Sequence, residues 1–514
     1  MATILNTFSL EGIDAYRVTV EASLLEGANS FTIIGLAEQS VKEAGERIEA
    51  ALARYGFFMP EGKKIISLAP ADIKKRGSHY DLSIAICLLA QCRLINVINP
   101  QKYIYIGELS LNGDLRGCRG VLPMVSEAKK LGYTDVIVPY DNYKEACLLS
   151  GMNIHAFRSL KEVIDFISGK SSGTPAYCYY DQYEEDQDEG MFPGLDFEEV
   201  KGQDELIDAI VLGAAGGHNI LMIGEPGCGK TMIASRIPTI LPSMNEEECL
   251  DVTKIYSIAG LLKKNGYLID KRPFRAPHHN ASLNALIGGG SGATPGDVTL
   301  AHNGVLFLDE LTEFSRTTLE ALRQPLENRY VTISRVNYTN TYPANFMLVA
   351  AMNPCPCGYR GSRRCRCSDY EIQKYRNKIS GPILDRIDIQ KNVKTVGYFD
   401  IQNQKGRTSA ELRKIVERTR KIQQERFKDI HGVSSNAGMT PALINKYCVL
   451  DKESDDLLRE ACDKHGYSAR VINKMLKVAR TSADLDMSER IRPSDILRVL
   501  SCRDLDSSED LYVV

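Results

Sequence analysis

Residues Gly224–Thr231 carry the strongest chemical signal in the sequence. They read Gly-Glu-Pro-Gly-Cys-Gly-Lys-Thr, which matches the pattern G-x-x-x-x-G-K-[ST]. The apolar residues Ile220–Ile223 directly before this loop indicate a buried strand, and the residues after it have helical spacing. In such a strand–loop–helix unit, backbone N–H groups and the helix N-terminus bind phosphate oxygens. The sequence therefore predicts a nucleoside triphosphate site.

Individual residues of this loop have different expected roles. Lys230 should neutralise the β- and γ-phosphates, and the Thr231 hydroxyl should bind Mg²⁺. Contacts with ATP are expected along the whole segment: Gly224, Glu225, Pro226, Gly227, Cys228, Gly229, Lys230, Thr231 and Met232.

A second apolar run, Gly304–Leu308, ends in two carboxylates. Downstream of a phosphate-binding loop, this order has a chemical reason. Asp309 is expected to help hold Mg²⁺ through its water shell, and Glu310 to act as the general base for the attacking water.

Four cysteines lie close together after the apolar strand that ends at Met352. Cys355 and Cys357 form one C-x-C pair, and Cys365 and Cys367 form another. Four thiolates can close a tetrahedral structural Zn²⁺ site, which we favour here. Two local disulfides, or reduced cysteines that fill a turn, are the alternatives.

Two other features carry polar groups without an assigned reaction. His278 and His279 are adjacent and cannot easily share one metal ion, so we expect a binding or packing role. An alternating strand, Tyr330–Val336, is expected to pair with 341–348 as a hairpin.

The elements that must position these residues indicate an α/β protein. Strands that end in the phosphate loop, in Asp309 and near Asn353 predict a doubly wound parallel sheet over 196–395 with the nucleotide at the carboxyl ends of its strands. Residues 396–514 have helical periodicity and should form a helical lid. Residues 171–195 carry an acidic run with no Lys or Arg, typical of a flexible linker, although a docking strip for a basic surface is an alternative.

Residues 1–170 predict a separate α/β domain. Strands are expected at 16–22, 30–34, 65–68 and 103–107, and helices at 41–55 and 82–90. The stretches 75–85 and 107–117 resemble the Lon-protease fold and, more closely, the N-terminal domain of the magnesium-chelatase-related ComM/YifB family. Leu122 and Met124 lie where this resemblance would place the catalytic lysine, so Ser78 and Ser83 lack a base and the domain is expected to be an inactive protease fold.

The rest of the chain resembles the magnesium-chelatase-like branch of the AAA+ ATPases, and nearly the whole chain resembles ComM/YifB. The resemblance implies that Asn353 orients the hydrolytic water, that Arg386 is an arginine finger for a neighbouring subunit, and that Arg470 is a second sensor reaching the γ-phosphate from the lid. It also places Val200, Gln203 and His218 in the segment that wraps the adenine and braces the phosphate loop.

The family further implies a hexameric ATP-driven DNA motor that acts in homologous recombination, with branch migration during natural transformation. Arg329, Arg335, Lys263 and Lys264 are candidates for a positive ring around DNA, with a hairpin that binds no ligand as the alternative. A magnesium-chelatase motor, an active Lon-type protease and a protein-remodelling ATPase are the alternative functions.

Bulk composition limits the remaining classes. A net charge of −3 excludes a globally basic nucleic-acid binder but not a local basic channel. No apolar run reaches the ~18 residues of a membrane span, and the N-terminus lacks the pattern of a secretory signal. Most of the 14 cysteines are scattered singly, as in a reducing cytoplasm, where we expect the protein to work.

Overall fold

We describe a computed structural model of the chain, in which residues 3–171, 194–262, 268–290, 293–335, 338–397, 406–430 and 432–505 are well enough placed for description. The chain divides into two compact units. Unit 1 comprises Met1–Asp186 and Cys249–Ile269, and unit 2 comprises Gln187–Glu248 and Asp270–Val514.

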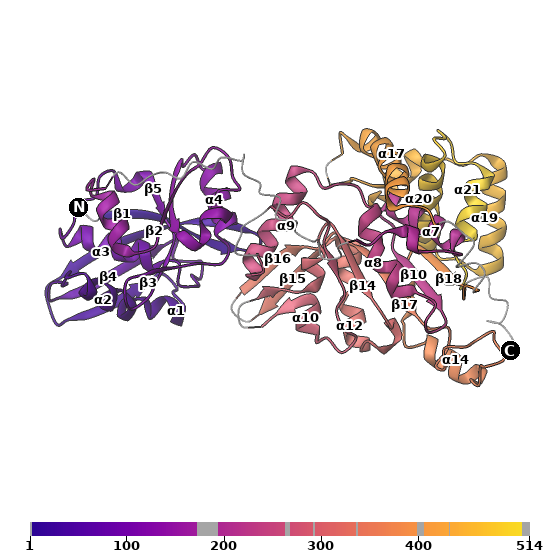
Figure 1. Ribbon diagram of the computed structural model, residues 1–514, viewed down its shortest axis with the longest axis horizontal. Helices are drawn as coiled ribbons and strands as arrows, with labels where there is room; N and C mark the ends of the chain where they lie inside the picture. Colours follow the sequence, from indigo (N-terminus) through magenta and orange to yellow (C-terminus); the bar gives the residue numbers. More distant parts are fainter. Residues whose placement is uncertain are drawn as a thin grey trace. The chain divides into compact units, whose positions relative to one another are not determined.

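Unit 1 is built on a seven-stranded mixed sheet with the order β3-β4-β2-β1-β5-β8-β9 (Figure 1). Strands β1, β2 and β4 pair antiparallel, whereas β3–β4, β1–β5, β5–β8 and β8–β9 are parallel. Its strands are β1 (Thr3–Glu11), β2 (Asp14–Leu25), β3 (Ser30–Ile34), β4 (Lys63–Ala69), β5 (Tyr103–Tyr105), β8 (Asp135–Pro139) and β9 (Asn153–Phe157), with a small hairpin of β6 (Glu108–Leu109) and β7 (Leu115–Arg116).

Helices pack on this sheet, and the buried side chains form two separate hydrophobic clusters. The helices of this unit are α1 (Gln39–Lys42), α2 (Ala44–Arg54), α3 (Asp81–Gln91), α4 (Val121–Lys130), α5 (Tyr143–Ala146) and α6 (Leu160–Ile167). Helix α3 is buried from Asp81 to Leu89, which explains its nearly continuous apolar sequence. The expected mixed α/β order is confirmed, but the sequence reading missed β1, an interior strand of the sheet.

One buried ion pair holds α2 against α3. The Arg47 guanidinium donates to both carboxylate oxygens of Asp81, at 2.8 and 2.9 Å, and the Leu109 N–H donates to the same carboxylate at 3.2 Å. The Asp81 side chain is 0% exposed, and burial raises its pKa to about 6 in spite of the Arg47 partner.

The two serines of the Lon-like stretch are engaged in hydrogen bonds. Ser78 donates to the Glu108 carboxylate, and Ser83 donates to the Tyr80 carbonyl at 2.8 Å. Leu122 and Met124 are fully buried in α4. Among the described residues, neither serine has a lysine as a hydrogen-bond partner.

Helix α9 (Glu246–Ala259) begins in unit 2, but from Cys249 onward the chain belongs to unit 1. Leu250 packs against the cluster of α4 and α5, and the Ser257 hydroxyl donates to Glu145 at 2.5 Å. The sequence reading placed this segment within the ATPase core.

Unit 2 contains a five-stranded, fully parallel sheet with the order β11-β14-β17-β10-β18. These strands are β10 (Ile220–Gly224), β11 (Phe274–Arg275), β14 (Val305–Leu308), β17 (Met347–Met352) and β18 (Ile389–Val393). The strand β10 lies between β17 and β18, so the phosphate loop, Asp309 and Asn353 all leave the carboxyl edge of one sheet. The expected doubly wound parallel sheet is confirmed.

Helices and small strands surround this sheet. They are α7 (Asp204–Gly216), α8 (Lys230–Ile240), α10 (Leu283–Ile287), α11 (Asp297–Leu300), α12 (Arg316–Ala321), α13 (Arg323–Asn328), α14 (Asp369–Arg376) and α15 (Gly381–Leu384), with β12 (Gly288–Gly289) and β13 (Thr294–Pro295). Helices α12 and α13 are separated at Leu322. Strand β15 (Tyr330–Arg335) pairs with β16 (Tyr338–Pro343), not with 341–348, because Met347 and Leu348 belong to the central strand β17.

Among the described residues, five C-terminal helices complete unit 2, as the periodicity predicted: α17 (Ser409–Phe427), α18 (Pro441–Tyr447), α19 (Lys452–His465), α20 (Ala469–Leu485) and α21 (Pro493–Leu500). Thr408 and Glu411 form a reciprocal capping box at the start of α17. Arg426 and Arg480 both bind the buried carboxylate of Asp484, which gives Arg480 a structural role. Among the described residues, each helix is too short or too polar to cross a lipid bilayer.

Candidate nucleotide site and cysteine cluster

The phosphate loop connects β10 to α8 through two glycines with left-handed backbone. Gly227 has φ +80° and Gly229 has φ +88°, a conformation that favours glycine. The Lys230 ammonium lies inside the loop and donates to the carbonyls of Gly224 (2.7 Å) and Glu225 (2.9 Å). It also donates to the Asn353 side-chain oxygen at 3.3 Å, which joins the loop to the end of β17.

Thr231 and Asp309 meet across the carboxyl edge of the sheet. The Thr231 hydroxyl donates to one Asp309 oxygen at 2.6 Å, and the Glu310 N–H donates to the other at 2.9 Å. Hydroxyl and carboxylate oxygens are the hard ligands that Mg²⁺ prefers, so this pair fits the expected metal. Lys230, Thr231, Asp309 and Asn353, which the sequence reading grouped, therefore lie together.

Glu310 has a partner that the sequence reading did not assign. Its carboxylate lies 3.2 Å from Nδ1 of His279, and its backbone has φ +50°. The His278 and His279 rings lie 4.1 Å apart. The expected binding or packing role of these histidines thus includes a contact with the candidate base.

Arg386 and Arg470 lie together but are not hydrogen-bonded to the phosphate loop of their own chain. Arg386 donates to the Pro382 carbonyl at 2.6 Å and pairs with Glu327, whose other oxygen accepts from Arg470 at 2.7 Å. The pairing with both arginines, led by the Arg386 hydrogen bond, lowers the pKa of Glu327. Glu327 was not among the residues predicted for the site.

Both arginines line a cavity of about 700 Å³ in unit 2, between the amino edge of the sheet and the C-terminal helices. Arg329 and Arg420 line the same cavity, and burial lowers the pKa of Arg420 to about 10. Arg329 lies against Gly438 at the end of α13, before the hairpin begins, and its place in a DNA-facing ring stays a prediction. The side chain of Arg335, like Lys263 and Lys264, lies outside the described residues.

The predicted adenine segment has a mixed outcome. Val200 is buried, and the Gln203 amide donates to the Lys394 carbonyl at the end of β18. His218 is buried at the amino edge of β10 and contacts the Thr481 hydroxyl of α20 at 2.8 Å. Burial lowers the pKa of His218 to about 4. Its side chain therefore braces a C-terminal helix instead of the phosphate loop.

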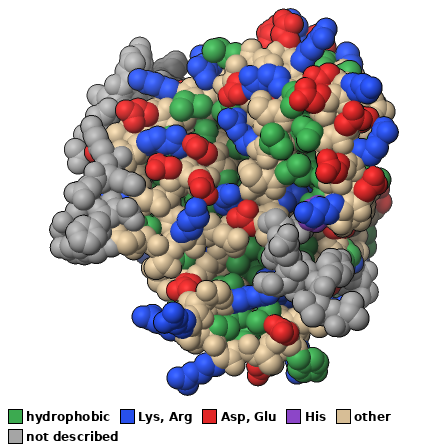
Figure 2. Space-filling view, turned by 90° about the vertical axis from the view of Figure 1, so that its right-hand side faces the viewer, with side chains coloured by type: hydrophobic (Ala, Val, Ile, Leu, Met, Phe, Trp, Pro, Cys, Tyr) green, Lys and Arg blue, Asp and Glu red, His purple; other side chains and the backbone are tan. Residues whose placement is uncertain are grey.

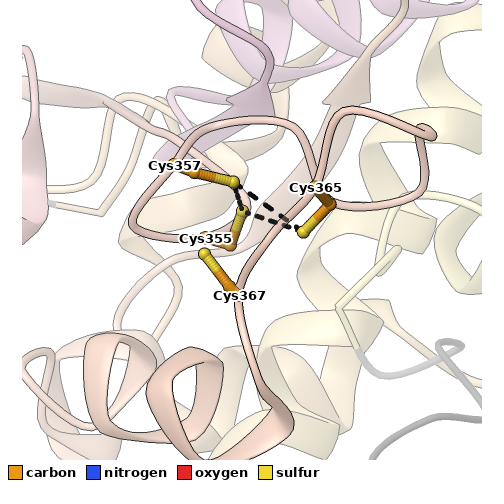
Figure 3. Close-up of side chains that lie close together, drawn as sticks. All are labelled: Cys355, Cys357, Cys365 and Cys367. Carbon is orange, nitrogen blue, oxygen red and sulfur yellow. Dashed lines mark hydrogen bonds between the residues drawn. The ribbon is translucent and has the colours of Figure 1, made fainter.

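The four expected cysteines come together in the loop after β17 (Figure 3). Their sulfur atoms all lie within 4.8 Å of one another, and all four thiols are free. Backbone N–H groups of Arg366 and Tyr359 donate to the Cys357 sulfur and lower its pKa to about 6, whereas burial raises the pKa of Cys355 to about 12. In unit 1 Cys147 is disulfide-bonded, which is an exception to the pattern of free cysteines elsewhere among the described residues.

Three family models match successive parts of the chain. The model described as magnesium chelatase, subunit ChlI, matches residues 196–401, and the one for the ChlI C-terminal part matches residues 406–503. A third, subunit ChlI of Mg-chelatase, matches residues 20–142. The two units therefore both have counterparts in magnesium-chelatase-related proteins.

Individual relatives cover nearly the whole chain. Competence protein ComM of Haemophilus influenzae is 39% identical over 497 residues, which are 96% of this chain and 95% of the relative. YifB of Escherichia coli is 38% identical over 515 residues, 98% of this chain and 97% of the relative. Lon protease 2 of Bacillus subtilis is 26% identical over 167 residues, 29% of this chain and 30% of the protease. The chain belongs to the ComM/YifB family of magnesium-chelatase-like AAA+ proteins.

Proposed function

We propose that this protein is an ATP-driven, ring-forming DNA motor of the helicase or branch-migration type, acting in homologous recombination and natural transformation. The observation that carries the ATPase part is two hydrogen-bonded pairs, Lys230 with Asn353 and Thr231 with Asp309, at the carboxyl edge of a parallel sheet. Those groups come from three strands and converge where a triphosphate would bind.

Each residue of the site has a part in hydrolysis. Lys230 exchanges its carbonyl partners for the β- and γ-phosphates, while Asn353 orients the attacking water. Thr231 and Asp309 hold Mg²⁺, which neutralises charge on the phosphates. Glu310 accepts the proton of the water, and His279 fixes the orientation of that carboxylate.

The remaining charge on the γ-phosphate is neutralised by a neighbouring subunit. Arg386 and Arg470 share Glu327 within one subunit, so both arginines are held as one group. We propose that this group faces the phosphates bound by the next subunit of a hexameric ring. The site is then incomplete in a monomer.

The DNA substrate has separate support. The Haemophilus influenzae relative is named a competence protein, in line with the role in natural transformation that the family resemblance implies. Figure 2 shows that Lys and Arg alternate with Asp and Glu on the face of unit 2 that carries the C-terminal helices, which is unlike a broad basic footprint. We therefore assign DNA to the ring interior, near the β15–β16 hairpin, and the motor to the cytoplasm.

A chelatase-type or protein-remodelling motor is the second candidate, since the family models of the chain are those of magnesium chelatase. The two functions separate in one assay. DNA should stimulate ATP hydrolysis in the purified protein without any chelatase partner, and a chelatase motor should not respond to DNA.

The decisive experiment measures strand displacement from forked and four-way DNA at low salt. Wild-type protein should displace strands only with ATP and Mg²⁺, and Lys230→Ala and Glu310→Gln should abolish displacement. Lys161→Ala, which removes an exposed lysine of α6, serves as the control and should leave displacement unchanged. A purified ring that hydrolyses ATP but neither binds nor unwinds any DNA would exclude the DNA motor.

The proposed cofactors are ATP, Mg²⁺ and a structural Zn²⁺ held by Cys355, Cys357, Cys365 and Cys367. Four free thiols in one cluster fit the ligand set of a structural zinc site. With four protein ligands no coordination position is open, so this zinc has no part in the hydrolysis itself.

A further inference from the structure

The segment Asn353–Ser380, between β17 and β18, holds the four cysteines and helix α14; we name it the cysteine lobe. We propose that Zn²⁺ bound by the four cysteines fixes this lobe against the phosphate loop, so that zinc occupancy controls nucleotide binding. The inference rests on the proposed ATP site. It assigns zinc a role in nucleotide affinity, although zinc takes no part in the hydrolysis reaction.

The sulfur positions match a tetrahedral zinc site. Cys355 and Cys357 sulfurs lie 3.4 Å apart, Cys355 and Cys365 3.9 Å, and Cys357 and Cys365 3.8 Å. A tetrahedral ion with Zn–S bonds of ~2.3 Å places its ligands ~3.8 Å apart. A disulfide requires ~2.05 Å, so none of these three distances is a disulfide bond. Figure 3 shows the Cys367 sulfur facing the same centre.

The part of the lobe that carries the cysteines, residues 356–367, has little else to hold its shape. Between Pro356 and Cys367, Gly358 is the one buried residue, and every other residue is half-buried or exposed. Arg363, Arg364 and Arg366 of this segment are exposed. In a loop without an apolar core, a metal held by four side chains would contribute directly to the stability of one conformation.

The metal-bound loop touches the phosphate loop directly. Gly358 follows the ligand Cys357, and its N–H donates to the carbonyl of the ligand Cys355 at 2.9 Å. Its backbone has φ +85°, and a Cβ atom there would lie 2.6 Å from Cδ of Pro226. Pro226 is the third residue of the phosphate loop. The position of Gly358 is therefore set by two ligands and limits where the phosphate loop can lie.

Two further contacts join the lobe to the hydrolytic residues. Asn353, two positions before Cys355, binds Lys230. The Tyr375 phenol oxygen of α14 accepts from the Thr312 hydroxyl at 2.7 Å and from the Asn353 N–H. Thr312 lies two residues after Glu310. If the lobe were disordered, the phosphate loop, Asn353 and the segment that follows Glu310 would therefore all lose a contact that holds them in place.

Two neighbouring glycines allow a matched test on the full-length protein. Gly358→Ala adds a methyl group against Pro226, whereas Gly361→Ala has the same backbone demand, at φ +89°, with nothing within 4 Å of the new atom. We expect both variants to retain one zinc per chain by elemental analysis. Gly358→Ala should weaken binding of a fluorescent ATP analogue about tenfold or more, and Gly361→Ala should change it by less than about threefold.

A second pair of variants tests the metal itself. Cys365→Ser should lose zinc and about tenfold or more in nucleotide affinity, whereas Cys462→Ser, at a half-buried thiol of α19, should retain both. Removal of zinc from the wild type by a chelator should weaken binding likewise, and added Zn²⁺ should restore it.

The outcomes separate this inference from the proposed function. Full nucleotide affinity in zinc-free protein, equal effects of the two glycine variants, or wild-type protein without zinc would each overturn the inference. If zinc-loaded wild type binds no ATP at all, the proposed ATPase fails instead.

Discussion

Mixed rings provide the sharpest test of the proposed shared site. If Arg386 acts on the ATP of a neighbour, an interface works when one subunit contributes an intact pocket and the other an intact arginine. Lys230→Ala removes the pocket function, and Arg386→Ala removes the finger. A ring assembled from equal amounts of the two variants should regain activity that neither variant has alone.

The activity expected of the mixed rings follows from how pockets and arginines combine at each interface. In random mixing, half of the pockets and half of the fingers are intact, so about a quarter of the interfaces combine both. Arg386→Ala alone should lower kcat by about 10³-fold, or ~4 kcal/mol of transition-state stabilisation. Arg386 must first leave Glu327 and the Pro382 carbonyl, and its side chain is only 10% exposed, so this release offsets part of the transition-state stabilisation.

The assay is ATP hydrolysis by co-assembled subunits, with native mass spectrometry to verify mixed rings. The control mixture combines Lys230→Ala with Glu310→Gln. Both changes damage the pocket, so this mixture should stay inactive wherever the arginine acts. Mixed rings of Lys230→Ala and Arg386→Ala that remain as inactive as their parents would refute a finger acting between subunits.

Further expectations concern single residues. Glu310→Gln should bind ATP with wild-type affinity but hydrolyse it at least ~10²-fold more slowly, and His279→Ala should lower kcat by a smaller factor without changing affinity; equal rates in wild type and Glu310→Gln would exclude the base. Asp81→Ala should lower the free energy of unfolding by ~3–5 kcal/mol in urea titrations, because it leaves the Arg47 guanidinium without its buried partner. The pKa of Asp81 is raised from 3.8 to about 6 in the folded state, so its contribution to stability is complete below 3.8 and decreases as the pH rises toward 6; the stability difference between wild type and Asp81→Asn should show this slope, and a flat difference would contradict it. Asp484→Ala should destabilise the C-terminal helices by ~3–5 kcal/mol, since Arg426 and Arg480 both depend on this carboxylate; a loss under ~1 kcal/mol would show that the pairs matter little.

The nucleotide site could be predicted because its signals are local. A buried strand, a glycine-rich loop and a helix follow one another without interruption from Ile220 to Ile240. Parallel strands bring their carboxyl ends to one edge, so the meeting of Thr231 with Asp309 follows from topology alone. The C-terminal helices could also be predicted from the sequence, because α17 combines amphipathic periodicity with a capping box.

Contacts between distant residues with no local pattern could not be predicted. Glu327 is 59 positions from Arg386 and 143 from Arg470, and in sequence it is an ordinary polar residue of a helix. The predicted range of the partner strand was wrong because the alternation of β15, which buries Val331 and Ile333, identifies a strand but not the residues that pair with it. Neither the contact of Gly358 with Pro226 nor that of His279 with Glu310 has any signal in the residue types.

The path of α9 has a practical consequence for dissection of the protein. The chain leaves unit 2 after Glu248 and returns at Asp270, so the ATPase part encodes a piece of the N-terminal core. A truncation that begins at residue 195 would keep Leu250 and Ser257 but remove the cluster and the Glu145 carboxylate that they bind. Such a fragment would expose an apolar helix face and aggregate. The resulting loss of activity could then be misread as evidence that ATP hydrolysis requires the N-terminal unit. An isolated motor should therefore be made by replacing 249–269 with a short polar loop.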